Sequence, residues 1–192
     1  MLEESRPSTK VSVSEVTVEV LDLNDEVPTF RQSYKGSVKE NVPPGTPVLV
    51  HPSISAVDND SGNNSVVHYS LGGSGSELFA ISENGAVVFS PQEPHAVLDR
   101  ERKEKYDLYV TATDLGNLSS STYLTITVED ENDNAPVFQH GPLFVLLPET
   151  SKPGTKVIQV IAHDADAKGI NSEIEYYITS GSKNDIRIDR IT

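Results

Sequence analysis

Acidic and amide side chains are concentrated in one short stretch, Asp130-Glu131-Asn132-Asp133-Asn134. Five oxygen-bearing side chains in a row, backed by backbone carbonyls, are the ligands that a hard divalent cation prefers. Asparagine and aspartate disfavour the interior of a strand, and Pro136 cannot donate to a sheet ladder, so the stretch is expected to connect two folded units. Without a cation, the carboxylates would repel one another. The stretch therefore predicts a linker that bound cations make rigid.

The composition excludes several functional classes. The chain has 192 residues, enough for one or two domains, and its 29 acidic against 15 basic residues give a net charge of −14. This balance argues against a nucleic-acid partner, which would require basic patches. With no cysteine there is no disulfide framework and no thiolate metal site. No signal peptide and no apolar run of membrane-spanning length is visible, so contact with a membrane is expected only through parts of the parent protein outside this chain.

The acidic stretch belongs to an internal repeat. Asp22-Leu23-Asn24-Asp25 echoes it, with Asp25 standing 108 residues before Asp133. Glu40 recurs as Glu149 after 109 residues, and Asp58 recurs as Asp164 after 106 residues. Three motifs in the same order with nearly constant spacing indicate a tandem array whose period is one small domain.

Between these motifs the chain is typical of β-structure. Short β-branched and often alternating segments are separated by turn residues such as Gly72-Gly73, Asn84-Gly85 and Asp114-Leu115-Gly116-Asn117. About seven such segments in one repeat predict an antiparallel β-sandwich. The strands expected from the pattern include Val11 to Val20, Val66 to Leu71, Ala86 to Phe89, Tyr106 to Thr111 and Tyr123 to Val128.

Several motifs in register give the chain a resemblance to extracellular cadherin repeats. They are Asp130-Glu131-Asn132-Asp133-Asn134-Ala135-Pro136, Leu98-Asp99-Arg100-Glu101, Asp58-Asn59-Asp60 and Ala112-Thr113-Asp114. The resemblance covers nearly the whole chain. It implies an all-β fold of tandem Greek-key, seven-stranded β-sandwich repeats. Residues 1–26 would be the end of one repeat with its linker, residues 27–134 a complete repeat with its linker, and residues 135–192 the first half of another.

The same resemblance implies a set of Ca²⁺ ligands at the second linker (residues 130–134), contributed by three parts of the chain. The ligands would be Glu40, Asp99 and Glu101; the Glu131 carbonyl, the Asn132 side chain, the Asp133 carboxylate and the Asn134 carbonyl; and Asp164, Asp166 and the Asn171 carbonyl. Six carboxylates among them carry a charge of −6, which three calcium ions would neutralise. Gly169 and Ile170 add one residue before Asn171 relative to the corresponding loop at Asn64, a departure that bears on the Asn171 assignment.

The first linker (residues 22–26) would hold one calcium ion, because most of the preceding repeat lies outside the chain. Glu26 stands where the family usually has asparagine, a change that a carbonyl contact should tolerate. The implied ligands are Asn24, the Glu26 carbonyl, Asp58, Asp60, the Asn64 carbonyl and Asp114.

Other interpretations of these motifs must be weighed. Asp58-Asn59-Asp60 alone would be an ordinary polar turn, and Asp99-Arg100-Glu101 alone would be a surface charge run. The segment from Asp164 to Glu175 partly mimics an EF-hand, but Lys168 occupies a ligand position and the flanks are strand-like. No nucleophile elbow, phosphate loop or zinc-protease motif is present. Paired carboxylates could serve a glycosidase, but a domain joint lacks the walls of a substrate cleft. The chain is therefore expected not to be an enzyme and to have no small-molecule substrate.

The resemblance implies calcium-dependent cell–cell adhesion, with other cadherin ectodomains on neighbouring cells as partners. Asn63-Asn64-Ser65 and Asn117-Leu118-Ser119 are glycosylation sequons, and extracellular calcium is abundant enough to fill sites of modest affinity, so the expected location is the extracellular side of the plasma membrane. The lack of tryptophan points away from cadherins that swap a tryptophan-bearing strand and towards the protocadherin, Fat or Dachsous kind. Two alternatives remain: a non-adhesive spacer or stalk of a signalling receptor, and a calcium-stabilised sandwich of a secreted enzyme or lectin.

Overall fold

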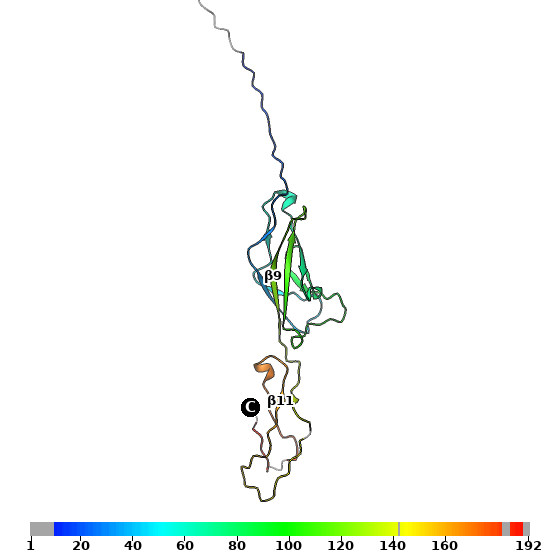
Figure 1. Cartoon of the computed structure of the whole chain (residues 1–192), viewed down its shortest axis with the longest axis vertical. Helices are drawn as coiled ribbons and strands as arrows, with labels where there is room; N and C mark the ends of the chain where they lie inside the picture. Colours follow the sequence, from blue (N-terminus) through cyan, green and yellow to red (C-terminus); the bar gives the residue numbers. More distant parts are fainter. Residues whose placement is uncertain (1–9, 142, 182–184, 190–192) are drawn as a thin grey trace, which may run out of the picture.

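The structure is a computed structural model that describes residues 10–141, 143–181 and 185–189 (Figure 1). A central sandwich, with its core between Tyr34 and Val128, follows an extended N-terminal segment and precedes a smaller C-terminal module whose first strand is β10 (Val137–Phe138). The first nine residues of the expected preceding repeat lie outside the described part, as do residues 142, 182–184 and 190–192 of the C-terminal module.

The main sheet of the central sandwich has five strands. They lie in the order β3 (Leu49–Val50), β2 (Tyr34–Lys39), β9 (Ser119–Glu129), β8 (Lys105–Thr113) and β5 (His68–Gly72). All neighbours are antiparallel except β2 and β9, which run parallel in the register Tyr34 to Leu124. The expected antiparallel sandwich thus contains one parallel pair, because the first long strand lies directly beside the last.

Smaller elements complete the sandwich and the C-terminal module. Within the described residues there are only short 3₁₀ helices and two-stranded sheets beside the main sheet. They are β1 (Thr29–Phe30) paired with β4 (Ala56–Val57), β6 (Phe79–Ile81) paired with β7 (Val87–Phe89), β10 (Val137–Phe138) paired with β11 (Ala162–His163), and the 3₁₀ helices η1 (Gly62–Ser65), η2 (Ser76–Leu78) and η3 (Ile170–Ser172). None of the described helices is long and apolar enough to cross a membrane.

The core is formed by the alternating inward side chains of β8 and β9. Leu108 and Val110 of β8 and Leu124 and Ile126 of β9 are at most 1% exposed, as a period of two residues requires for a half-buried strand. Phe79 of the small β6–β7 sheet covers this face, with its ring 5.3 Å from that of Tyr106. The all-β sandwich expected from the sequence is therefore confirmed.

The prediction of a strand from Val11 to Val20 was wrong. The segment is extended but has no sheet partner among the described residues, and its valines are almost fully exposed, from 79% at Val11 to 92% at Val20. The alternation marks the face that a strand would bury, but a strand also needs neighbours that accept its hydrogen bonds. In the central sandwich the corresponding segment is β9, which pairs with both β2 and β8.

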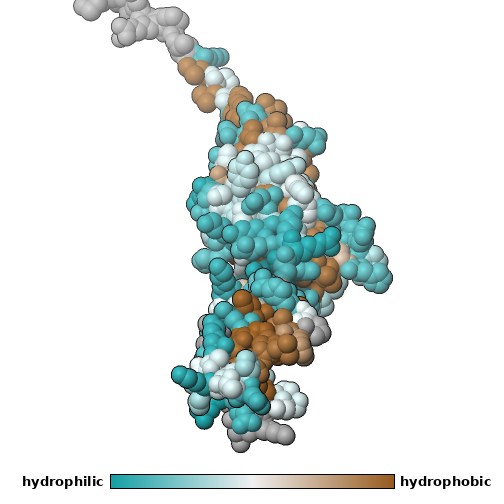
Figure 2. All heavy atoms as spheres, turned by 60° about the horizontal axis from the view of Figure 1, so that its bottom comes forward, coloured by the Kyte–Doolittle hydropathy of each residue, from teal (hydrophilic) through white to brown (hydrophobic). Residues whose placement is uncertain are grey.

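The C-terminal module leaves much apolar surface uncovered. Phe144 and Leu146 are 85% and 82% exposed, and Leu143 is about half exposed. Figure 2 shows the resulting hydrophobic patch on this module below the more polar central sandwich. Only β10 and β11 form a sheet in its described part, so the apolar face lacks a second layer.

Candidate metal centre

Glu40 directly follows β2 and is only 1% exposed. Its carboxylate accepts two backbone hydrogen bonds, from the N–H of Arg100 at 2.8 Å and from the N–H of Glu131 at 2.7 Å. These donors come from a loop and from the second linker, far apart in the sequence. A buried carboxylate is stable only when it is paired or hydrogen-bonded. Glu40 therefore fixes the loop at Arg100 and the linker at Glu131 to the end of the central sandwich that faces the C-terminal module.

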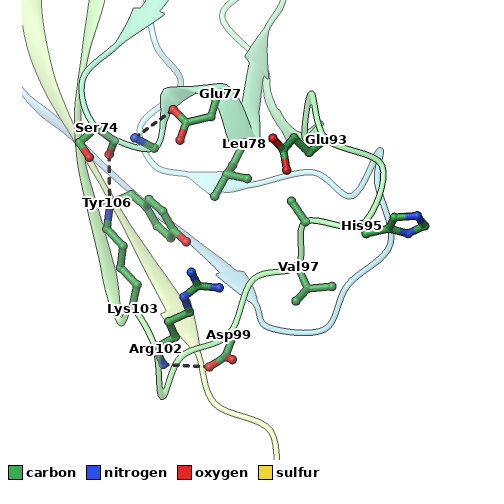
Figure 3. Close-up of a pocket in the computed structure, with 12 residues that line it drawn as sticks. Ser74, Glu77, Leu78, Glu93, His95, Val97, Asp99, Arg102, Lys103 and Tyr106 are labelled. Carbon is green, nitrogen blue, oxygen red and sulfur yellow. Dashed lines mark hydrogen bonds between the residues drawn. The ribbon is translucent and has the colours of Figure 1, made fainter.

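Asp99 and Glu101 belong to the turn that follows the core residue Leu98. One oxygen of Asp99 accepts the backbone N–H of Arg102 at 2.8 Å, as Figure 3 shows beside the hollow lined by Lys103 and Tyr106. The turn thereby aims Asp99 and Glu101 at Glu40. Ligand oxygens of all three residues lie within 4.8 Å of one another. They form the first acidic group at the second linker.

Glu101 also belongs to a second group that joins three parts of the chain. Its carboxylate lies within 4.8 Å of oxygens of Asp130 in the linker and Asp166 in the C-terminal module. Burial, together with the negative charge of Glu40, raises the pKa of Glu101 despite its contact with Arg100. The raised pKa means that the ionised carboxylate of Glu101 is disfavoured in the folded chain. A divalent cation among these oxygens would stabilise the ionised form.

The remaining linker residues continue the network into the C-terminal module. Asp133 accepts hydrogen bonds from Asn41 Nδ2 at 2.5 Å and from Asn134 Nδ2 at 2.7 Å. The side chain of Asn134 also donates to Asp166 at 2.9 Å. Asp133 is therefore connected to Asp166 through Asn134, although Asp133 belongs to neither acidic group.

Four further expected ligands lie at the same joint. Asn132 Nδ2 is 3.3 Å from the carbonyl oxygen of Asn171, so the two predicted ligands face each other. Asp164 is 6% exposed, and one of its oxygens accepts the backbone N–H of Asp166 at 3.0 Å. The side chain of Glu131 instead turns towards Lys39 at 3.7 Å, which leaves its backbone carbonyl as the group that a cation could use.

Asp130 is the residue of this centre that sequence reasoning left without a role. Its carboxylate accepts the backbone N–H of Ala167 at 2.9 Å and the side-chain amide of Asn171 at 2.7 Å, and it pairs with Arg100. Burial would raise the pKa of Asp130, but the hydrogen bonds from Asn171, Ala167 and Arg100 lower it overall. The sequence does contain one indication that Asp130 matters. Asp130 is the first residue of the repeated linker motif, and Asp22 is the first residue of the same motif in the first linker.

The first linker repeats this geometry. Oxygens of Asp58, Asp60 and Asp114 lie within 4.8 Å of one another. Asp22 accepts the backbone N–H of Ser61 at 3.0 Å and the side-chain amide of Asn64 at 2.9 Å, as Asp130 does with its own loop. The extra residue before Asn171 therefore leaves its side-chain contact with the linker unchanged.

Glu26 and Asp60 hold the first linker to the central sandwich. The backbone N–H of Glu26 donates to Asp60 at 3.3 Å. Desolvation raises the pKa of Asp60 in spite of this hydrogen bond, and the nearby charges of Asp58, Asp22 and Asp25 add to the increase.

Polar atoms without partners test whether these residues suit a cation. One carboxylate oxygen each of Asp58, Asp114 and Asp166 is buried with no hydrogen-bond partner. The side-chain oxygen and nitrogen of Asn24 are also buried without a partner. A buried polar atom without a partner costs free energy comparable to a lost hydrogen bond. Oxygen-rich sets of this kind fit Ca²⁺, which takes six to eight oxygen ligands. The donor set therefore fits the ion that the sequence predicts.

Comparisons with known proteins agree with the geometry. The family model for the Cadherin domain matches residues 34–129. Protocadherin Fat 4 of Mus musculus is 38% identical over 178 residues, and protocadherin-23 of Homo sapiens is 42% identical over 175 residues. These matches cover 91% and 88% of this chain, but only 3% and 5% of the relatives.

Solved structures of cadherin ectodomains superpose on most of the chain. Mouse cadherin-23 EC22-24 superposes with a TM-score of 0.75 at 33% identity, covering 91% of this chain and 54% of that one. The protocadherin gammaB7 EC3-6 structure, described as a cis-dimer, gives 0.72 at 31% identity and covers 88% and 41%. From its sequence motifs, its sandwich and these matches, the chain belongs to the cadherin family.

Proposed function

We propose that this chain is a calcium-rigidified segment of a cadherin ectodomain. The second linker holds calcium through the acidic groups around Glu40, Glu101 and Asp166, with Asp133, Asp164 and the Asn132, Asn134, Glu131 and Asn171 oxygens completing the coordination. Asp130, which sequence reasoning omitted, joins this set. The first linker holds one further ion through Asp58, Asp60 and Asp114, with Asn24, Glu26 and Asn64.

One observation carries this proposal. Carboxylates from the central sandwich, the linker and the C-terminal module converge at one joint, and an oxygen of Asp166 there is buried without a partner. Glu101 belongs to both acidic groups, so a cation in either group reduces the repulsion in the other. The carboxylates that come together belong to separate modules. Their attraction to shared ions therefore fixes the angle between those modules.

The proposed organisation is one repeat ending at residue 26, a complete repeat over residues 27–134, and the first half of another over residues 135–192. With calcium about tenfold above the dissociation constant, each bound ion adds about 1.4 kcal/mol to the ordered form. Several ions at one joint would thus convert a flexible connection into a stiff one.

Stiff tandem repeats support calcium-dependent adhesion between cells, with other cadherin ectodomains as partners and the extracellular side of the plasma membrane as the location. The family is a non-enzymatic adhesion family, which agrees with the absence of catalytic motifs in the sequence. The cis-dimer described for protocadherin gammaB7 supports contact with a related ectodomain. Millimolar calcium outside the cell would keep such sites filled.

Calcium-dependent thermal unfolding tests the proposal. Asp133→Ala should remove at least the stabilisation of one ion, about 1.4 kcal/mol at calcium tenfold above the dissociation constant. Glu83→Ala is the matched control, because Glu83 is an exposed acid outside every acidic group. Equal calcium-induced shifts of the unfolding temperature in the two variants would refute the assignment of the second linker.

A further inference from the structure

Arg100 contacts three parts of the chain at the second linker. Its Nη2 atom lies 2.6 Å from Glu101 Oε1, and its Nε atom donates to Asp130. The same Nη2 atom is 3.2 Å from the carbonyl oxygen of Ala165 in the C-terminal module. One guanidinium therefore contacts the central sandwich, the linker and the C-terminal module at once.

Asp130, one of the partners of Arg100, is also hydrogen-bonded to the C-terminal module. Asp130 receives two hydrogen bonds from the C-terminal module, from the Ala167 N–H and the Asn171 amide. Arg100 and Asp130 have side chains only 17% and 12% exposed, so the pair is more shielded than an ordinary surface ion pair. Burial would lower the pKa of Arg100, but Asp130 and Glu101 raise it, which keeps the guanidinium charged.

A second observation shows that the docking of the linker is a repeated feature. At the first linker Asp22 makes the same two contacts, with the Ser61 N–H and the Asn64 amide. The first aspartate of each linker thus accepts hydrogen bonds from the loop that follows it in the chain. Only at the second linker does the chain contain the preceding turn, and there Arg100 adds the positive charge.

We infer that Arg100, Asp130, Asn171 and the Ala165 and Ala167 backbone form a polar latch that holds the second linker in register without calcium. Arg100 is its positioning residue. The inference deepens the proposed function, since the latch would leave the calcium ligands already assembled before an ion binds. It also affects the charge balance, because seven carboxylates and one guanidinium leave a charge of −6 at the joint.

The latch can be measured in EDTA by the distance between spin labels across the joint. The chain has no cysteine, so Ser33→Cys and Lys156→Cys, both exposed positions, give a unique labelled pair. Arg100→Met should raise the open fraction of the joint about tenfold, the factor that corresponds to about 1.4 kcal/mol and that suits a charge-assisted network. Asn171→Ala should act in the same direction while keeping Arg100 and the Asn171 carbonyl.

The matched control is Arg102→Met, which removes the same charge two residues away, from an exposed side chain beside the hollow in Figure 3. A second labelled pair within the C-terminal module, at Lys156 and Lys168, distinguishes opening of the joint from melting of the module. Broadening confined to the cross-joint pair in Arg100→Met and Asn171→Ala supports the latch. A broad distribution in the unsubstituted chain, equal effects of Arg100→Met and Arg102→Met, or broadening of both labelled pairs would overturn it.

Calorimetric titration of the unsubstituted chain with calcium decides the proposed function separately. If no calcium binds, the proposed function fails, and the comparison in EDTA still decides whether the latch exists. If calcium binds and Arg100→Met leaves the joint closed in EDTA, only the latch fails.

Discussion

At the scale of single residues, the acidic side chains of the second linker are fixed by two kinds of donor. Backbone N–H groups hold Glu40 and Asp99, so their orientation follows from the fold of the turn and the linker. Side-chain amides of Asn41 and Asn171 hold Asp133 and Asp130. Donor groups that do not themselves bind the ion orient ligands in this way at many metal sites. The oxygens are therefore largely positioned by the chain itself.

Replacing Glu101 by glutamine should have opposite effects with and without calcium. The folded-state pKa of Glu101 is raised, so the fold binds its proton more tightly than the unfolded chain does. The ionised carboxylate consequently opposes folding at neutral pH, and this penalty fades as the pH falls through the raised pKa. In EDTA at neutral pH, Glu101→Gln should therefore unfold at an equal or higher temperature than the unsubstituted chain.

In calcium the same substitution should lose the stabilisation of about one ion, about 1.4 kcal/mol at tenfold the dissociation constant. Thermal unfolding followed by circular dichroism in both conditions measures the two effects. Glu104→Gln is the control, because Glu104 is a nearby exposed acid paired loosely with Lys105. A clear loss of stability for Glu101→Gln in EDTA would contradict the assigned electrostatic role.

At the scale of elements, turn chemistry and alternation predicted most of the central sandwich. The turn at Asn84-Gly85 has Gly85 at a φ of 79°, and Asn117 adopts a φ of 65°, the left-handed conformation that suits these residue types. The long strands β8 and β9 extend beyond the predicted ranges by one to four residues at their ends. The alternation of apolar and polar residues could not show that Val11 to Val20 lacks a neighbouring strand, because hydrogen bonding in a sheet depends on other segments of the chain.

Only the residues of the candidate site that belong to sequence motifs could be predicted. The resemblance to cadherin repeats implied that Glu40, Asp99 and Asp166 belong together, and the two acidic groups that contain them meet at Glu101. The contact of Arg100 with Asp130 and Ala165 could not be foreseen, because it depends on the direction in which the turn after Leu98 projects its side chains. Sequence spacing gives the residues that share a motif, but not the orientation of side chains across a joint.

The loop that carries Gly116 offers a test of the first linker alone. A Cβ atom at this position would lie 2.5 Å from the Asn24 side-chain oxygen, so Gly116→Ala should displace the Asn24 side chain. The backbone of Gly116 does not have the positive φ that would require glycine. The main effect expected of the substitution is therefore weaker calcium binding at the first linker. Calorimetric titration should detect the loss of one site.

Gly141→Ala is the matched control, because a Cβ atom there meets no other atom within 4 Å. Calcium binding at the second linker should be unchanged in both variants. If Gly116→Ala bound the full number of ions with unchanged affinity, Asn24 would not belong to the first site.

At the scale of the whole molecule, the described part of the chain is an extended N-terminal segment, a central sandwich and a smaller C-terminal module, with an acidic linker before and after the sandwich (Figure 1). The central sandwich has its own core, whereas the C-terminal module exposes Phe144 and Leu146. The apolar side chains of the C-terminal module are therefore less covered than those of the central sandwich. Since the chain spans 3–5% of the relatives named above, the activity of the parent protein requires a functional test.

Bead aggregation separates adhesion from a passive spacer. Beads coated with the chain present many copies, so even weak contacts between copies gain strength through multivalency. If these repeats adhere, the beads should aggregate in millimolar calcium, disperse in EDTA, and aggregate less when Asp133→Ala loosens the second linker. Small-angle scattering on the free chain should show calcium-dependent stiffening in either case, because the ions act on the linkers whether or not a partner binds. Stiffening without aggregation would assign the chain to a spacer and contradict an adhesive role for these repeats.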